Sequence, residues 1–184
     1  MTAFTFRTTP AILSEPGAAA KIGALAAEQG VTNVAFVTDK GVLGLGLADA
    51  AMEGIRAAGL GLHLIDDVVA DPPESLVLSA ADRARAAGCD GVVSVGGGSS
   101  MDTAKLVALL LNSSEKLADV YGVGLVKGRR APLILAPTTA GTGSEVTPIA
   151  IVTTGESEKK GVVAPQLLPD WAVLDAELTL GLPR

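Results

Sequence analysis

The feature that most constrains this chain is a run of three glycines between an apolar strand-like segment and an apolar helix-like segment. Residues 90–95 read as a buried strand, glycines 96–98 follow, and residues 101–111 read as a helix. Glycines at such a turn let backbone N–H groups approach an anion, with the partly positive helix end pointing at it. We predict a phosphate-binding turn here. The alternative is a turn that serves strand-to-helix geometry alone. The usual dinucleotide fingerprint is absent, because Met101 stands where it requires glycine or alanine.

The whole chain alternates short β-type runs with helical segments, which is the pattern of a parallel sheet with crossover helices. We therefore predict an α/β fold: a Rossmann-like parallel sheet with flanking helices, in one domain over residues 1–184. A C-terminal β-hairpin is expected from residues 149–153 and 161–164. The other expected strands are 34–38, 62–69, 90–95, 132–136 and 171–174, and the expected helices are 16–29, 47–58, 71–87 and 101–111.

A second polar loop, residues 138–145, follows the expected strand 132–136 and reads TTAGTGSE. Hydroxyl groups and glycines dominate it, a composition suited to hydrogen-bonding the hydroxyls and phosphates of a nucleotide. Ligands of open parallel sheets bind beyond the carboxyl ends of the strands, where both loops are expected. The alternative is a plain Ser/Thr/Gly loop that caps a helix.

Asp39 adds a carboxylate at the end of the expected strand 34–38. In dinucleotide sites an acid at this type of position accepts hydrogen bonds from the adenosine ribose and repels a 2′-phosphate, which favours NAD over NADP. The alternative is that Asp39 serves only as the N-cap of the next helix.

Composition excludes several classes of function. Fourteen Lys and Arg stand against 20 Asp and Glu, for a formal net charge of −6, so no nucleic-acid partner is expected. Apolar runs fall short of a membrane span, so no membrane partner is expected either. Cys89 is the single cysteine and reads as a buried reduced thiol, which fits a cytoplasmic protein. His63 is the single histidine, in an apolar run, and is expected to have a structural or surface role rather than a catalytic one.

Residues 96–105, GGGSSMDTAK, followed by residues 137–145, PTTAGTGSE, resemble the iron-containing (group III) alcohol dehydrogenase family. The resemblance implies that Asp39 holds the adenosine ribose and that Asp71 lies near the adenine. Lys159 matches a lysine that reaches the nicotinamide-side ribose, although Lys160 beside it leaves the register open. Asp102 matches an aspartate of the motif, or stabilises the helix dipole. The resemblance also implies that the pyrophosphate is held by Gly97, Gly98 and Ser99. The part of the cofactor between pyrophosphate and nicotinamide would be lined by Thr138, Thr139 and Thr142.

The resemblance covers essentially the whole chain but only the N-terminal half of the family. Members also carry an all-helical domain, whose aspartate and histidines hold a catalytic divalent metal, iron or zinc. We expect that domain to lie outside this chain, which stops at Pro183 and Arg184. No catalytic or metal-binding residue is therefore assigned here, and the metal is expected only in the full-length protein.

The leading interpretation is the cofactor-binding half of an NAD-dependent, metal-dependent alcohol dehydrogenase that interconverts an alcohol and an aldehyde or ketone by hydride transfer. Its partners would be NAD(H) and a small alcohol or aldehyde, and this chain alone would be inactive. A non-catalytic nucleotide-binding module is the second interpretation. A related enzyme such as a sugar-phosphate cyclase is the third. The identity of the substrate and the formation of a homo-oligomer stay open.

Overall fold

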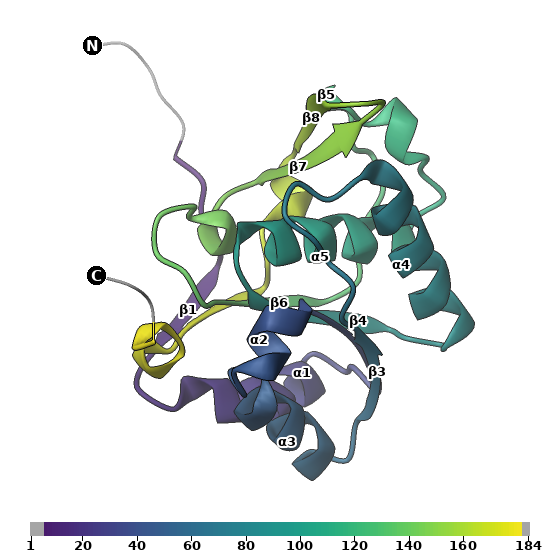
Figure 1. Cartoon of the computed structure of the whole chain (residues 1–184). Coiled ribbons are helices and arrows are strands. Elements are labelled where there is room, and N and C mark those ends of the chain that lie inside the picture. Colours follow the sequence, from purple (N-terminus) through teal and green to yellow (C-terminus); the bar gives the residue numbers. More distant parts are fainter. Residues whose placement is uncertain (1–5, 182–184) are drawn as a thin grey trace.

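The computed structural model describes residues 6–181, and its centre is a six-stranded sheet in which every neighbouring pair is parallel (Figure 1). This confirms the predicted Rossmann-like α/β fold. Pro183 and Arg184, the last residues of the sequence, lie outside the described residues. The strands of this sheet are β1 (Ala11–Ser14), β2 (Asn33–Val37), β3 (Gly61–Ile65), β4 (Gly91–Gly96), β6 (Leu133–Pro137) and β9 (Trp171–Leu174), in the spatial order β1-β9-β6-β4-β2-β3.

A second, smaller sheet contains the predicted hairpin. Strands β7 (Ile149–Thr154) and β8 (Glu158–Val163) pair in antiparallel fashion, with Ala150 opposite Val162. The hairpin is confirmed, but the sequence did not indicate its third strand, β5 (Gly122–Val123), which runs parallel to β8. Two residues are too few to show the alternation by which a strand is recognised.

Helices cover both faces of the main sheet. α1 (Ile22–Glu28) and α3 (Asp49–Ala57) pack on one face, and α4 (Glu74–Ala86) and α5 (Gly98–Leu111) on the other. Because α5 lies between the main sheet and the smaller sheet, it is apolar almost all round and buried on both sides (Figure 1). The short helices are α2 (Lys40–Gly44) and the 3-10 segments η1 (Ala18–Lys21), η2 (Leu117–Asp119), η3 (Ser144–Val146), η4 (Pro165–Leu167) and η5 (Ala176–Thr179).

Several predicted boundaries were wrong, because capping, strand pairing and backbone conformation decide where an element begins and ends. Strand 62–69 ends at Ile65, because its ladder partner β2 ends at Val37. Helix 101–111 begins three residues earlier, at Gly98, because extended Gly97 serves as its N-cap. Helix 16–29 is divided into η1 and α1, and its helical turns begin only after Gly17, which is left-handed at φ 74°.

The order of the strands places a crevice beside β2. From β2 the chain crosses to β3 at one edge of the sheet, and it then returns to β4 on the opposite side of β2. The connections that leave β2 and β4 therefore diverge, and a crevice opens beyond the carboxyl ends of these strands. Such switch points are where open parallel sheets bind ligands.

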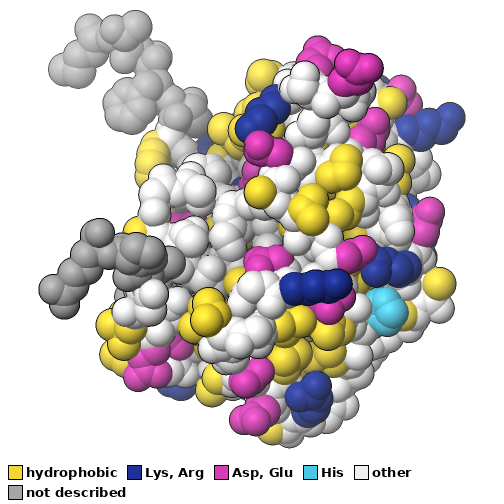
Figure 2. Space-filling model, in the orientation of Figure 1, with side chains coloured by type: hydrophobic (Ala, Val, Ile, Leu, Met, Phe, Trp, Pro, Cys, Tyr) yellow, Lys and Arg dark blue, Asp and Glu magenta, His cyan; other side chains and the backbone are white. Residues whose placement is uncertain are grey.

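The surface agrees with the mixed composition. On the face shown in Figure 2, Lys and Arg side chains are scattered among Asp and Glu and do not gather into one patch. Within residues 6–181, no helix combines the length and the apolar character needed to cross a membrane. Cys89 is buried as a free cysteine, as predicted, and His63 lies in the edge strand β3.

Candidate cofactor site

The N-terminus of α5 faces the crevice without a side-chain cap. Gly97, the N-cap residue, is extended (φ −79°, ψ −175°), and no side chain in the described part of the chain caps the first turn. The first N–H groups of a helix have no partner within the helix, so those of α5 are free to bind an anion. Gly97 and Gly98 both have negative φ, so any need for glycine here comes from space rather than from strain.

Asp39 lies across the crevice from this turn. Its Oδ1 accepts a hydrogen bond from the Val42 N–H at 3.0 Å, which caps α2. Its Oδ2 accepts a hydrogen bond from the Ser100 hydroxyl at 3.2 Å. The predicted alternative, a helix cap, is therefore present. It does not exclude a ribose contact, because each carboxylate oxygen has two lone pairs.

A hollow of about 360 Å³ opens beside Asp39, and we call it the Asp39 hollow. The residues after β3 form its apolar wall, and the first turn of α5 forms its floor. A dinucleotide end group would meet a carboxylate on one side and backbone N–H groups on the other. The lining residues are Asp39, Val68, Val69, Ala70, Gly97, Gly98, Ser99, Ser100 and Thr139.

A second hollow of about 360 Å³ lies on the other side of the same turn, and we call it the Lys159 hollow. Gly98 and Ser99 line both hollows, so the N-terminus of α5 separates two chambers of equal size. The residues that line the Lys159 hollow are Asp71, Pro72, Gly98, Ser99, Asp102, Thr142, Ser144, Thr147, Ile149, Ile151 and Lys159.

Asp71 and Lys159 form an exposed ion pair in the Lys159 hollow, with Nζ 2.6 Å from Oδ1. The family resemblance implied opposite ends of the cofactor for them, adenine for Asp71 and the nicotinamide-side ribose for Lys159. The structure instead brings them together on one side of the α5 turn. The adenine contact of Asp71 and the ribose contact of Lys159 both stay predictions.

The structure distinguishes Lys159 from its neighbour Lys160. Successive residues of a strand point to opposite faces. Lys159 lines the hollow, whereas the Lys160 ammonium lies 5.8 Å from the centre of the Tyr121 ring. Of the two lysines, only Lys159 is therefore in a position to reach a ligand in this hollow.

The three predicted threonines do not share one environment. Thr139 lines the Asp39 hollow and Thr142 lines the Lys159 hollow, one on each side of the turn. Thr138 is buried, its N–H donates to the Gly96 carbonyl at 3.0 Å, and it lines neither hollow. The direct role predicted for Thr138 is therefore the least supported of the three.

Asp102 lines the Lys159 hollow, yet both of its oxygens are engaged. Oδ1 accepts a hydrogen bond from the Ser144 hydroxyl at 2.6 Å, and Oδ2 accepts one from the Ile151 N–H at 3.0 Å. These bonds join α5 to η3 and β7. A direct contact between Asp102 and a cofactor stays a prediction, and its observed role is to tie these segments together.

Three features of the site were missed at the sequence level. Ser100 supports Asp39, although it belongs to the glycine-rich motif already identified. Ile149 and Ile151 are exposed in the hollow, and their alternation with buried Ala150 and Val152 was readable as a half-buried strand. Lys105, also inside the first motif, is fully buried, and the apolar residues around it were the available signal.

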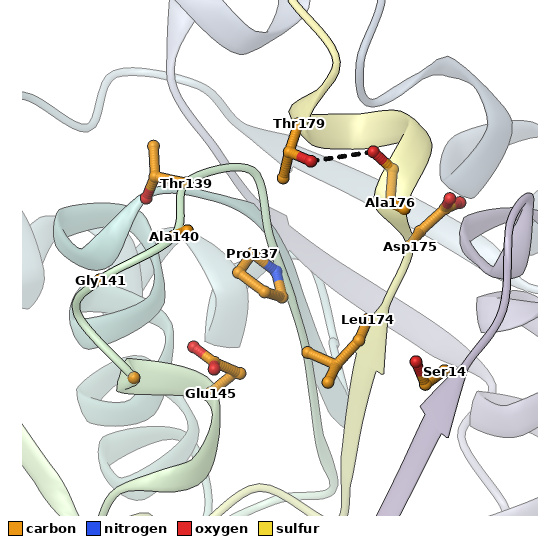
Figure 3. A pocket seen from close by; sticks show the side chains of 11 residues that line it. Ser14, Pro137, Thr139, Ala140, Gly141, Glu145, Leu174, Asp175, Ala176 and Thr179 are labelled. Atoms are coloured by element: carbon orange, nitrogen blue, oxygen red, sulfur yellow. Dashed lines mark hydrogen bonds between the residues drawn. The ribbon is translucent and has the colours of Figure 1, made fainter. Parts of the chain in front are cut away.

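A larger hollow, of about 460 Å³, lies elsewhere, beyond the ends of β1, β6 and β9. In Figure 3 the Glu145 carboxylate points into it, whereas Asp175 turns away toward η1. Asp175 there accepts hydrogen bonds from the Gly17 and Ala19 N–H groups, both at 3.0 Å. Only Thr139 among the predicted cofactor residues lines this hollow, so size alone does not identify the cofactor site.

Residues 6–181 contain no group of three or more His, Cys, Asp or Glu side chains that could hold a metal ion. A catalytic metal site requires about three protein ligands. The residues described here therefore do not fit the metal that the family resemblance implies.

Comparison with known proteins identifies the family. The sequence profile described as iron-containing alcohol dehydrogenase matches residues 9–176. That match covers most of the chain, so this chain belongs to the iron-containing alcohol dehydrogenase family.

Individual relatives match only part of their own length. The chain is 43% identical to 4-hydroxybutyrate dehydrogenase of Cupriavidus necator over 158 residues, which are 84% of this chain and 41% of the relative. It superposes on the structure of a 1,3-propanediol oxidoreductase with a TM-score of 0.95 and 28% identity, covering 99% of this chain and 48% of the other. The chain thus spans less than half the length of these relatives.

A further solved relative was determined with a bound cofactor. Sulfoacetaldehyde reductase from Bifidobacterium kashiwanohense, solved in complex with NAD+, matches with a TM-score of 0.88 and 29% identity. The match covers 100% of this chain and 49% of the reductase chain. The fold described above is therefore found in a protein that binds NAD+.

Proposed function

We propose that this chain is the NAD-binding half of an alcohol dehydrogenase that interconverts an alcohol and an aldehyde or ketone by hydride transfer. The observation that carries the proposal is the pair of hollows on either side of the uncapped α5 N-terminus. A dinucleotide has the same plan, with two nucleosides on either side of a pyrophosphate.

The described residues fit NAD in charge as well as in shape. The N–H groups of the first turn of α5, backed by the helix dipole, suit the pyrophosphate. A side chain at position 98 would be crowded, since its Cβ would lie 2.9 Å from Thr142 Cγ2. Asp39 supplies acceptors for the adenosine ribose hydroxyls and repels a 2′-phosphate, which supports NAD over NADP.

The chain's own residues would bind and orient the cofactor. Asp39 would hold the adenosine ribose, the first turn of α5 the pyrophosphate, and Lys159 the ribose on the nicotinamide side. Bound NAD(H) supplies the acceptor or donor of hydride. The apolar side chains of Ile149 and Ile151 would limit water around a ring held in the Lys159 hollow.

Residues 6–181 offer no cluster of side chains that could hold a metal ion. The same observation supports the second candidate, a non-catalytic nucleotide-binding module. Determining the gene sequence beyond codon 184 separates the two. A following helix with an aspartate and a histidine at i and i+4, and two further histidines, supports the enzyme; a stop codon supports the module.

Calorimetric titration of the purified chain with NADH, NADPH and ADP tests the cofactor assignment. We expect NADH and ADP to bind with one site each, and NADPH to bind more weakly than NADH. A folded chain that binds neither NADH nor ADP would overturn the proposal.

The free, buried Cys89 supports a reducing compartment, and we propose the cytoplasm.

A further inference from the structure

Lys105, in the middle of α5, is fully buried and is not among the residues assigned to the cofactor. Its Nζ donates hydrogen bonds to the Thr147 carbonyl at 2.9 Å and to the Ile149 carbonyl at 2.7 Å. The same ammonium lies 3.7 Å from Asp102 Oδ1. A charged group has therefore been brought into the core to contact the start of β7.

Asp102 extends these contacts along the same segment. Its bonds to Ser144 and Ile151, described above, lie on either side of the carbonyls that Lys105 binds. Two side chains of α5 thus hold residues 144, 147, 149 and 151. All four of these residues line the Lys159 hollow.

Burial of Lys105 is costly, and stability alone does not account for it. Desolvation lowers the pKa of Lys105 to about 8, although the charges of Asp102 and Glu145 oppose the shift. Replacing a buried charged group by a well-packed apolar one is often neutral or stabilising. The lysine at this position therefore indicates a role in holding neighbouring segments in place.

The geometry points to Lys105 as a positioning residue, which acts with Asp102 to hold the wall of the Lys159 hollow at a set distance from the first turn of α5. This inference rests on the proposed function and deepens it. The wall is formed by Thr147, Ile149 and Ile151, and the first turn of α5 supplies the pyrophosphate site. Lys105 would thereby set the space available to the nicotinamide half of NAD, while it touches no part of the cofactor.

The inference predicts that Lys105 affects the affinity for NADH but not the affinity for ADP. ADP would occupy the Asp39 hollow and the α5 turn, which Lys105 does not contact. NADH would occupy the Lys159 hollow as well. Loss of Lys105 should therefore weaken NADH and leave ADP unchanged, whereas a general loss of stability would not distinguish these ligands.

The test is calorimetric titration of the Lys105→Met chain with NADH and ADP. Methionine keeps much of the side-chain volume and removes the donors. We expect the Kd for NADH to rise about tenfold, because the wall of the Lys159 hollow would no longer be held in place, and the Kd for ADP to stay within about twofold. Asp102→Asn, which keeps the shape of the side chain, should also raise the Kd for NADH, by a smaller factor, and leave the Kd for ADP unchanged. This variant serves if Lys105→Met does not fold.

Arg130→Met is the matched control. Arg130 lies before β6, and it binds Asp170 with Nη1 2.6 Å from Oδ2 and donates to the Leu168 carbonyl at 2.6 Å. Its loss should lower the melting temperature without changing either Kd.

Equal affinity of the parent and of folded Lys105→Met for NADH would overturn the inference, as would a parallel loss of NADH and ADP. A parent chain that binds neither ligand would instead overturn the proposed function, on which the inference depends.

Discussion

The Ser100 hydroxyl donates a hydrogen bond to Asp39 Oδ2 at 3.2 Å, across a separation of 61 residues in the chain. The bond links the end of β2 to the first turn of α5 on the two sides of the crevice. The other oxygen of Asp39 caps α2. Asp39 is thus held in one orientation by two separate elements before any ligand arrives, which is the preorganisation expected of a binding carboxylate.

Asp39→Asn should change the choice of cofactor while it preserves the helix cap. Asparagine caps helices about as well as aspartate, so we expect stability to change by less than about 0.5 kcal/mol. Loss of the negative charge removes the repulsion of a 2′-phosphate, and the ratio of NADPH to NADH affinity should rise about tenfold. Calorimetry with both cofactors measures the ratio, with Asp49→Asn, at an exposed acid of α3, as the control. An unchanged ratio would mean that Asp39 serves only as a cap and a partner of Ser100.

Gly98→Val should abolish most NADH affinity and leave the fold largely intact. The φ angle of Gly98 is not in the left-handed region, and the nearest atom to an added Cβ belongs to the exposed side chain of Thr142, which is able to shift. The added methyl groups would occupy the space between the two hollows. NADH titration and thermal melting of the same sample measure both effects.

Gly44→Val is the matched control for that experiment, since a Cβ there would meet no atom within 4 Å. It should bind NADH like the parent. Normal NADH binding by a Gly98→Val chain that melts like the parent would contradict the proposed pyrophosphate site.

Lys159→Met should weaken NADH about threefold to tenfold, as for loss of one charge-assisted contact. Its ion pair with Asp71 is exposed, 58% and 67% for the two side chains, so the loss should cost at most about 1 kcal/mol of stability. Lys160→Met, which removes the lysine beside the Tyr121 ring, should leave NADH affinity unchanged. The opposite result for the two lysines would place the ligand on the other face of β8.

Cys89 should resist alkylation in the folded chain. Burial, and secondarily the charge of Asp90, raise the pKa of Cys89 to about 11. At pH 8 the reactive thiolate is then scarce, and iodoacetamide should react about 100-fold more slowly than with the chain in urea. Mass spectrometry against time measures both rates, and equal rates would show that the thiol is accessible and ionised in the native state.

The purified 184-residue chain should bind NADH without oxidising alcohols, even after addition of iron or zinc. The physical reason is that residues 6–181 offer no group of three side chains able to hold the metal. Turnover followed by NADH absorbance checks this, with and without each metal. Metal-stimulated turnover would contradict the assignment of the metal site to residues outside those described.

The sequence by itself was sufficient to predict the class of fold and the two loops that meet at the crevice. Alternating apolar strands and helices are local patterns, and so is the glycine run before α5, because backbone preferences and burial of one face act within a few residues. The carboxyl ends of parallel strands lie at one edge of a sheet, so the loops after β4 and β6 had to be neighbours. The boundaries of α5 and β3 were wrong because capping and strand pairing decide them.

Only the tertiary structure decided which side chains share a chamber. The insertion of β9 between β1 and β6, and the pairing of Asp71 with Lys159 across 88 residues, depend on contacts that no local pattern encodes. The same holds for Lys105, whose partners are backbone carbonyls of β7 and of the residues before it. Strand order and long-range hydrogen bonds depend on how whole elements pack. Lys105 is buried because α5 lies between two sheets.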